Sequence, residues 1–407
     1  MKKLKVADGI YMLTMNVEDI LFEGIWDIAN GVTLNSYIVK GDKTAIIDGV
    51  VGWDGAPENL YSSMEELGVD PKSIDYLIVN HMEPDHSGWI EDFRKIKDDF
   101  TIICTDKAAQ LVTSFYGEDK IRIVKEGDTL DLGQGKVLSF HPVPNVHWPD
   151  TMYTYEQSTK TLFSCDMFAA FGSMKDHYFD DEMTPEEVEF FEFEGIRYYS
   201  NVMTTFTPSL RRAIDKARTL DISIVAPGHG PVYRANPQKI IDDYHRFSLY
   251  AQGSGKNQVA ILWGSMYGMT KRAVEFVERI LQREGVKYTK LETPLNSESE
   301  TVAQVFQSAA VIIGTPTYEY NMFPPVAAAL SEIGRKKISG KVAFRFGSFG
   351  WSGGAEKELA EITEKYKINW EFLESVEFQG SPKDEHFNQI EARVLELIEK
   401  MKEKVVE

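Results

Sequence analysis

The chain has 407 residues, 43% of them hydrophobic and 12% aromatic, so it can build two or three folded domains and is not a disordered protein. The net charge is −19, and a net of −17 falls in the first 255 residues. Such an acidic surface repels a phosphate backbone, which excludes nucleic acid as a partner. No apolar run approaches the roughly 20 residues of a membrane span, and the N-terminus has no apolar signal core. We therefore expect a cytoplasmic protein without a membrane segment.

The first 250 residues alternate short apolar strands with a few helices. Strands are predicted over 34–39, 44–48, 75–79, 101–104, 136–140, 152–155, 161–165 and 222–226. Helical spacing predicts helices near 60–67 and 111–115, and the acidic stretch 184–218 is expected to be helical with a break at Pro208. Cys104 and Cys165 lie in strands and form no C-x-x-C pair, which is typical of buried thiols in a reducing cytoplasm. This order of elements favours an αββα sandwich.

Four residues with metal-ligating side chains stand within six positions, directly after the strand at 75–79. They are His81, Glu83, Asp85 and His86, in the run H-x-E-x-D-H. A strand end that opens into a loop can point several such side chains into one cavity. The run resembles the H-x-H-x-D-H signature of the metallo-β-lactamase fold, with Glu83 in place of the second histidine. A carboxylate is a harder ligand than imidazole, so the change favours iron or manganese over zinc.

Three more possible ligands follow predicted strands further along the chain, namely His147, Asp166 and His229. Any one of them alone is more simply a structural residue. Together with the four-residue cluster they match the two-metal pattern of the lactamase fold segment by segment. We assign a first metal to His81, Glu83 and His147, a second to Asp85, His86 and His229, and a bridging position to Asp166. In relatives of this pattern the histidine at the place of His86 can be turned away and replaced by water.

The pattern changes after a small polar linker at 251–257. Strands predicted over 259–263, 288–291, 310–314, 341–346 and 370–378 alternate with helices, including helices over 271–284 and 384–404. Five strands alternating with helices predict a doubly wound parallel sheet. We therefore expect two α/β domains, residues 1–252 and residues 256–407.

Three loops of the second domain are predicted to bind a flavin. The first resembles the T-x-T-G-x-T phosphate loop of flavodoxins, and all three would meet at the carboxyl edge of the sheet. An α/β domain without a ligand also uses glycines and hydroxyls in such turns. No GxGxxG fingerprint is present, so a tightly bound nicotinamide dinucleotide is not expected. The predicted binding residues are Ser265, Met266, Tyr267, Gly268, Met269 and Thr270, then Pro316, Thr317, Tyr318 and Glu319, then Gly347, Ser348, Phe349, Gly350 and Trp351.

The combination of these two domains resembles the flavodiiron protein family over essentially the whole chain. The resemblance implies two non-haem iron ions per chain and FMN, and the reduction of dioxygen to water or of nitric oxide to nitrous oxide. It also implies a head-to-tail homodimer, or a dimer of dimers, in which the FMN of one subunit lies beside the iron site of the other. The chain shows no rubredoxin or flavin reductase module of its own, so we expect electrons from a rubredoxin-like protein or a reduced deazaflavin coenzyme. Trp26, Phe171 and Tyr199 are weaker predictions for side chains near the irons, since aromatic residues are more often simply core.

Two other functions use the same residues. A dizinc hydrolase of the lactamase fold with an appended flavin domain would bind zinc, but Glu83 and the flavin loops argue against it. A flavodoxin-like electron carrier with a degenerate lactamase domain would bind FMN without metal, yet all seven ligand positions are filled.

Overall fold

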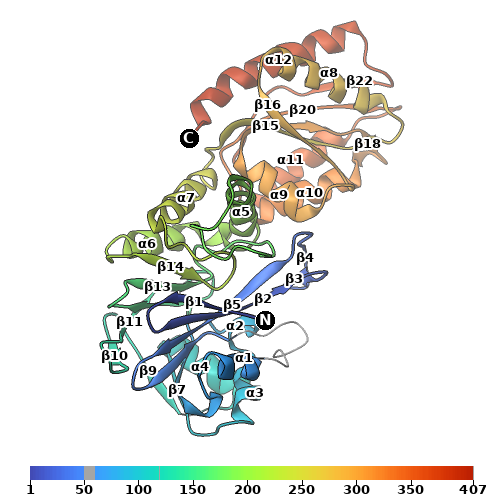
Figure 1. Ribbon diagram of the computed structural model, residues 1–407. Helices are drawn as coiled ribbons and strands as arrows, with labels where there is room; N and C mark the ends of the chain where they lie inside the picture. The colour runs from blue at the N-terminus through green and yellow to red at the C-terminus, as the bar shows by residue number, and fades with distance from the viewer. Residues whose placement is uncertain (50–59, 119, 407) are drawn as a thin grey trace. The chain divides into compact units, whose positions relative to one another are not determined.

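The computed structural model describes residues 1–49, 60–118 and 120–406, and backbone contacts divide them into two compact units (Figure 1). Unit 1 comprises residues 1–199 and 206–245, and unit 2 comprises residues 200–205 and 246–407. This division falls inside helix α7 (Pro237–Tyr250), some residues before the predicted linker. Within the described ranges no helix combines the length and the apolar character that a membrane crossing requires.

Unit 1 contains two large sheets. The first has seven strands in the order β1-β2-β5-β6-β7-β8-β9, which are antiparallel up to β6 and parallel from β6 to β9. The second has five strands in the order β10-β11-β12-β13-β14, of which only the last pair is parallel. The strands of the first sheet are β1 (Lys2–Ala7), β2 (Ile10–Val17), β5 (Val32–Lys40), β6 (Thr44–Ile47), β7 (Ile74–Ile78), β8 (Thr101–Cys104) and β9 (Ile121–Ile123). Those of the second are β10 (Thr129–Asp131), β11 (Val137–Pro142), β12 (Met152–Glu156), β13 (Thr161–Cys165) and β14 (Ile224–Pro227).

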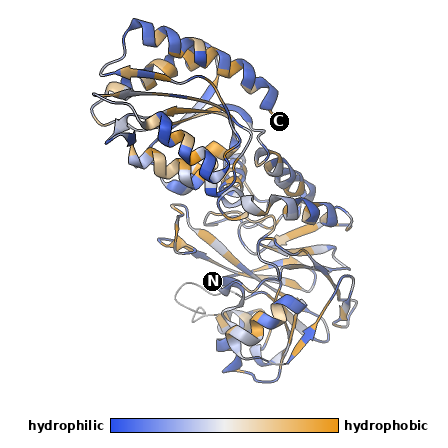
Figure 2. Ribbon diagram, turned by 180° about the vertical axis from the view of Figure 1, so that it is seen from behind, coloured by the Kyte–Doolittle hydropathy of each residue, from blue (hydrophilic) through white to orange (hydrophobic). Residues whose placement is uncertain are grey.

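The core of unit 1 lies between these sheets, where apolar side chains from both of them form one buried cluster. A second cluster covers the outer face of the seven-stranded sheet with α1 (Leu60–Glu66), α3 (Ile90–Arg94) and α4 (Asp106–Tyr116). Helices α5 (Pro185–Tyr198), α6 (Thr207–Ala217) and α7 accompany the five-stranded sheet. Figure 2 shows the resulting pattern, with apolar strands and with helices whose outer faces are polar. The predicted αββα sandwich is confirmed.

The helical stretch 184–218 is broken earlier than predicted. Helix α5 ends at Tyr198, a π-helical turn (Tyr199–Met203) and a 3₁₀ turn (Thr204–Phe206) follow, and Pro208 lies inside the first turn of α6. The predicted break at Pro208 is therefore wrong. Proline is accepted at the start of a helix because the first turn leaves its backbone N–H groups without helical partners.

Unit 2 is a parallel sheet in the order β16-β15-β17-β20, with β21 and β22 both pairing β20. This is the predicted doubly wound arrangement, with the long last strand split in two. Its strands are β15 (Lys256–Trp263), β16 (Lys287–Glu292), β17 (Ser308–Gly314), β20 (Val342–Phe349), β21 (Glu371–Phe372) and β22 (Val376–Gln379). Its helices are α8 (Met269–Arg283), α9 (Glu298–Gln307), α10 (Pro324–Arg335), α11 (Ala355–Tyr366) and α12 (Asp384–Met401).

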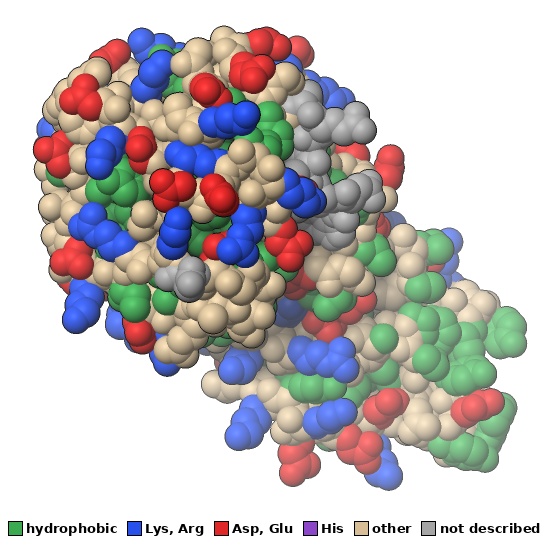
Figure 3. Space-filling model, turned by 90° about the horizontal axis from the view of Figure 1, so that it is seen from below, with side chains coloured by type: hydrophobic (Ala, Val, Ile, Leu, Met, Phe, Trp, Pro, Cys, Tyr) green, Lys and Arg blue, Asp and Glu red, His purple; other side chains and the backbone are tan. Residues whose placement is uncertain are grey.

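Charges of both signs are mixed over the face of unit 1 that Figure 3 shows. Acidic and basic side chains alternate there at short range, and apolar side chains appear only in small groups between them. Among the described residues, this face shows no extended basic surface of the kind that a nucleic acid requires.

Candidate diiron and flavin sites

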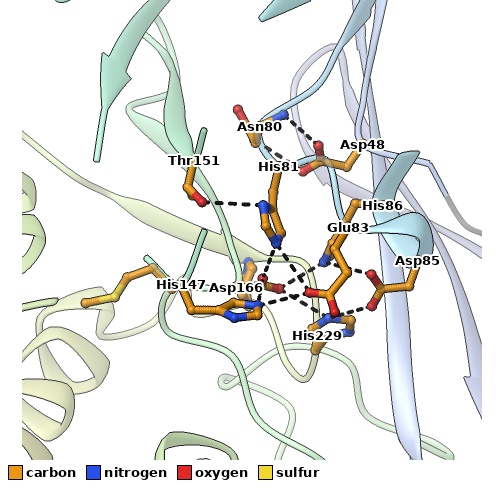
Figure 4. A network of polar contacts seen from close by, with 12 residues as sticks. Asp48, Asn80, His81, Glu83, Asp85, His86, His147, Thr151, Asp166 and His229 are labelled. Carbon is orange, nitrogen blue, oxygen red and sulfur yellow. Dashed lines mark hydrogen bonds and ion pairs between the residues drawn. The ribbon is translucent and has the colours of Figure 1, made fainter. Parts of the chain in front are cut away.

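The first predicted ligand group meets around one point between the sheets of unit 1 (Figure 4). His81 Nε2 lies 3.3 Å from Glu83 Oε2 and 3.4 Å from Asp166 Oδ2. His147 Nε2 approaches the same two carboxylate oxygens to 2.9 and 3.4 Å. One ligand atom from each of these four residues lies within 4.8 Å of the others, as binding of one metal ion requires.

The second group lies on the other side of Asp166. His229 Nε2 lies 3.4 Å from Asp85 Oδ2, and His86 Nε2 lies 3.8 Å from Asp85 Oδ1. Both rings also face Asp166 Oδ1, at 2.9 Å for His86 and 3.3 Å for His229. Asp166 thus presents Oδ2 to the first group and Oδ1 to the second, which is the position of a bridging carboxylate.

The two sheets contribute different ligands. His81 and Glu83 follow β7 of the seven-stranded sheet, and the short helix α2 (Pro84–Ser87) carries Asp85 and His86. His147 lies in the loop between β11 and β12, Asp166 directly follows β13, and His229 follows β14, all in the five-stranded sheet. Proline at the first position of α2 fixes the turn that redirects the chain after Glu83.

Two of the imidazole rings are oriented by groups behind them. His229 Nδ1 donates to the backbone oxygen of Thr33 at 2.9 Å, which leaves Nε2 as the free lone pair facing Asp85 and Asp166. His81 Nδ1 lies 3.4 Å from Thr151 Oγ1 and 3.5 Å from Asp150 Oδ2. Such outer contacts fix the tautomer and raise the basicity of a metal-binding histidine.

Several buried atoms of the site have no hydrogen-bond partner among the described residues. Asp85 Oδ1, Asp166 Oδ2 and His229 Nε2 are inaccessible to solvent and make no hydrogen bond within the described structure. A buried polar atom without a partner costs about 1–3 kcal/mol, more when it is charged. Asp166 Oδ2 faces the first ligand group, and Asp85 Oδ1 and His229 Nε2 belong to the second, so each group has a buried atom that a metal ion would satisfy. This donor set of imidazoles and carboxylates suits iron.

The charges of the ligands compensate one another when no metal is bound. Burial lowers the pKa of His81, His86 and His147, but contacts with the carboxylates outweigh it and raise each pKa to about 10. Burial raises the pKa of Glu83, but hydrogen bonds from His147 and His81 outweigh it and bring that pKa to about 2. Without metal, the three imidazoles are therefore protonated and balance the charge of the carboxylates. Metal binding must release these protons, because a histidine ligates a metal in its neutral form.

His86 has a second possible environment. Besides the group with Asp85 and His229, it lies within metal-ligating range of Asp48 and Cys165. Gly228 leaves room for the ring, because a Cβ at that position would lie 2.7 Å from His86 Cε1. His86 Nε2 lies 2.9 Å from Asp166 Oδ1, and the role of His86 as an iron ligand stays a prediction.

The aromatic residues predicted near the site differ in how close they lie to the ligands. The ring of Tyr198 lies 5.8 Å from that of His229 and 5.0 Å from that of Phe171, all between ring centroids. Tyr199 instead hydrogen-bonds Thr207 through its hydroxyl at 3.2 Å and packs on Tyr244, so its neighbour Tyr198 is the tyrosine beside the ligands.

Trp26 is buried and lies opposite Phe22 in the small hairpin β3 (Leu21–Phe22) to β4 (Trp26–Asp27), where Phe22 contacts His229 at 6.0 Å between ring centroids. Sequence reasoning missed Phe22 and Tyr198, as well as Thr33, Asp48 and Asp150 behind the ligands. Asp48 follows a strand as the ligands do, and Asp150 closes the run His147–Asp150, so these two carried a signal.

In unit 2 a cavity of about 410 Å³ opens where the three predicted flavin loops meet. Ten of the fifteen predicted residues line it, together with Gly380, which follows β22 and was not predicted. The ten are Met266, Tyr267, Met269, Thr317, Tyr318, Glu319, Ser348, Phe349, Gly350 and Trp351. The first two loops follow the carboxyl ends of β15 and β17, and the third begins within the last residues of β20, so all three lie at the edge where doubly wound sheets bind ligands.

The other five predicted residues shape these loops. Ser265 Oγ accepts from the backbone N–H of Gly268 at 3.1 Å, in the turn that leads into α8, and the backbone oxygen of Pro316 accepts from Phe323 at 3.0 Å. Thr270 Oγ1 lies 3.0 Å from Ser348 Oγ and so joins the first loop to the third. Gly347 lets the third loop approach the second, since a Cβ there would lie 1.7 Å from the backbone oxygen of Thr315. The N-terminus of α8 and these hydroxyls fit a phosphate, and the exposed rings fit a flavin above it.

Known proteins resemble this chain along most of its length. A family model described as ODP family beta lactamase matches residues 32–230. A nitric oxide reductase of Moorella thermoacetica is 29% identical, covering 89% of this chain and 90% of that protein. An anaerobic nitric oxide reductase flavorubredoxin of Vibrio vulnificus is 31% identical, covering 83% and 68% respectively.

Solved structures agree with this result. The flavodiiron protein from Giardia intestinalis superposes with a TM-score of 0.88 at 27% identity, over 99% of this chain and 98% of that one. The rubredoxin oxygen:oxidoreductase of Desulfovibrio gigas gives a TM-score of 0.89 over 99% of both chains, at 24% identity, which speaks to the fold alone.

The fold and the site together define a metallo-β-lactamase-like metalloprotein joined to a flavodoxin-like domain. Its similarity to the flavorubredoxins and flavodiiron proteins covers both parts. The chain belongs to the flavodiiron protein family, and it is an oxidoreductase. The predicted family and fold class are confirmed.

Proposed function

We propose that this protein reduces dioxygen to water, nitric oxide to nitrous oxide, or both, using electrons that an external donor delivers through FMN. The observation that carries the proposal is the position of Asp166, which presents one carboxylate oxygen to each of two ligand groups. A bridged pair of metal ions is what binding a diatomic molecule between two metals requires. Family membership and the flavin cavity of unit 2 support the redox character.

Two non-haem iron ions would supply the site of reduction, and FMN would supply the electrons. His81, Glu83 and His147 would hold the first iron, and Asp85, His86 and His229 the second, with Asp166 shared. The three carboxylates compensate much of the positive charge of the metals. The rings of Phe22, Phe171 and Tyr198 pack on one another beside His229, and so limit access of water on that side.

The function is tested by following gas consumption with each donor. Dioxygen and nitric oxide uptake would be recorded separately, with chemically reduced rubredoxin and with reduced deazaflavin coenzyme. Fast uptake of at least one gas with either donor supports the proposal, and the faster pair identifies substrate and donor. Two zinc ions and no iron in anaerobically purified protein, without gas uptake, would support the dizinc hydrolase instead. FMN without metal would support an electron carrier.

A head-to-tail homodimer, or a dimer of dimers, is part of the proposal. Tyr267, Trp351 and Tyr320 stand at or beside the flavin cavity with 85, 80 and 63% of their surface exposed, an apolar rim that a second subunit would cover. A cytoplasmic location is also proposed, and the two free cysteines support it.

Mixing two inactive variants is expected to restore activity. Chains with Glu83→Ala lack an intact iron site, and chains with Gly347→Ala lack FMN. A mixed head-to-tail dimer pairs the FMN of one chain with the irons of the other, so random reassociation should recover about a quarter of the wild-type rate. Steady-state nitric oxide or dioxygen uptake after mixing measures it. Electron transfer within one chain predicts no recovery, because neither chain then has both cofactors.

A further inference from the structure

Arg345 is a fully buried charged side chain of unit 2, close in sequence to the third flavin loop. It lies on β20, two residues before the third flavin loop, and none of its surface is exposed. Arginine is almost never completely buried unless its guanidinium is paired. The contacts of this guanidinium therefore identify the groups that compensate its buried charge.

The partners of Arg345 come from three different segments. Nη1 donates to Glu377 Oε1 on β22 at 2.7 Å and lies 3.3 Å from Glu356 Oε2 in the first turn of α11. Nη2 lies 3.5 Å from the backbone oxygen of Thr315. Nε has no hydrogen-bond partner within the described structure.

Each of these segments continues into the flavin cavity. Thr315 precedes Thr317, β22 ends just before Gly380, and the third loop runs from Gly347 to the start of α11. Gly347 also packs closely on the Thr315 peptide. One guanidinium thus fixes the loops that line the cavity relative to one another.

The charges around Arg345 do not balance. One positive group faces two carboxylates, and Glu377 and Glu356 keep 31 and 53% of their side-chain surface exposed. Reduction of a flavin adds electrons and leaves the ring anionic near neutral pH. A charge held among the segments that line the cavity would therefore act more strongly on the reduced form than on the oxidised form.

We propose that Arg345 is a positioning residue for FMN that also sets the relative affinity of the site for reduced and oxidised flavin. The inference rests on the proposed FMN binding. Arg345 holds the loops in place, and its positive charge offsets one of the two carboxylate charges, so reduced FMN is repelled less than Glu377 and Glu356 alone would repel it. A residue with a merely structural role would change FMN affinity without changing the preference between redox forms.

The test uses variants that change the charge of the cluster in opposite directions. Arg345→Met removes the positive charge and should favour oxidised FMN by about tenfold, which lowers the midpoint potential by about 30 mV for a two-electron couple. Glu377→Gln and Glu356→Gln each remove a negative charge and should raise the potential. Arg345→Lys keeps the positive charge and should keep the wild-type potential. It should bind FMN more weakly, since a lysine cannot reach both the carboxylates that Nη1 contacts and the Thr315 oxygen that Nη2 contacts. Spectroelectrochemical titration and quenching of FMN fluorescence measure both quantities.

Glu361→Gln, an exposed glutamate on α11, is the matched control and should shift neither quantity. Unchanged potentials in all the cluster variants, or shifts of the same sign, would overturn the inference while FMN binding stands. A wild-type chain that binds no FMN would instead contradict the proposed function. If Arg345→Met does not fold, the two glutamine variants carry the test alone.

Discussion

Replacing Glu83 with alanine is expected to remove the first iron and abolish gas reduction while FMN stays bound. Its carboxylate lies at 2.9 Å from His147 and 3.3 Å from His81, so the variant leaves the first metal with two imidazoles and the shared Asp166. Iron content should fall from about two to about one per chain, and turnover by at least about a thousandfold, because a missing ligand costs more than the 10- to 100-fold seen for outer contacts. Metal analysis, the FMN absorption band and gas uptake measure the three effects.

The matched control is Glu65→Ala, which removes an exposed carboxylate from α1 in the same unit. It should keep both irons and the full rate. Glu83→His would supply a nitrogen donor and is expected to raise the share of zinc in the purified protein. A Glu83→Ala protein with two irons and wild-type turnover would show that the ligand assignment is wrong.

Gly347→Ala is expected to have the converse effect, losing FMN and keeping iron. The new Cβ would lie 1.7 Å from the backbone oxygen of Thr315 and 2.7 Å from its carbonyl carbon. Neither atom can move without shifting the second flavin loop, since β17 and β20 pair directly below it. A cost of about 3 kcal/mol, at the upper end for overpacking, weakens FMN binding by about 100-fold.

Gly353→Ala in the same loop is the control, because its Cβ would make only an ordinary contact of 3.4 Å with Glu377. FMN titration of both variants, with iron determined in parallel, separates a local effect from a general loss of folding. If Gly347→Ala bound FMN as tightly as Gly353→Ala, the close approach of these two loops would be irrelevant to the flavin.

The sequence was most informative where a ligand directly follows a strand. His81, Asp166 and His229 each follow a predicted strand, and they were predicted as ligands because, together with the other four residues, they match the two-metal pattern of the lactamase fold. Thr33 could not be found in this way. It contributes a backbone oxygen from within β5, and only the three-dimensional structure brings that atom to His229.

The tyrosine beside the iron ligands shows a different limit. Tyr198 and Tyr199 are adjacent, and neighbours on a helix point about 100° apart, so a small change of helical phase exchanges them. The π-helical turn that starts at Tyr199 makes such a change, and no local feature of the sequence predicted it. The flavin loops were easier, because glycines and hydroxyls mark them, whereas Gly380 follows a short strand that the prediction had merged into a longer one.

The division of the iron ligands between the two sheets makes the metal pair a cross-link within unit 1. Four ligands belong to the end of β7 and α2, and three to the five-stranded sheet, and Asp166 touches both groups. Metal that binds only the folded chain adds its binding free energy to folding. The irons would thus link the two sheets of the sandwich at one edge. Protein from which a chelator has removed the iron should therefore unfold at a lower temperature than protein that contains iron. Loss of iron would then weaken the scaffold as well as the chemistry.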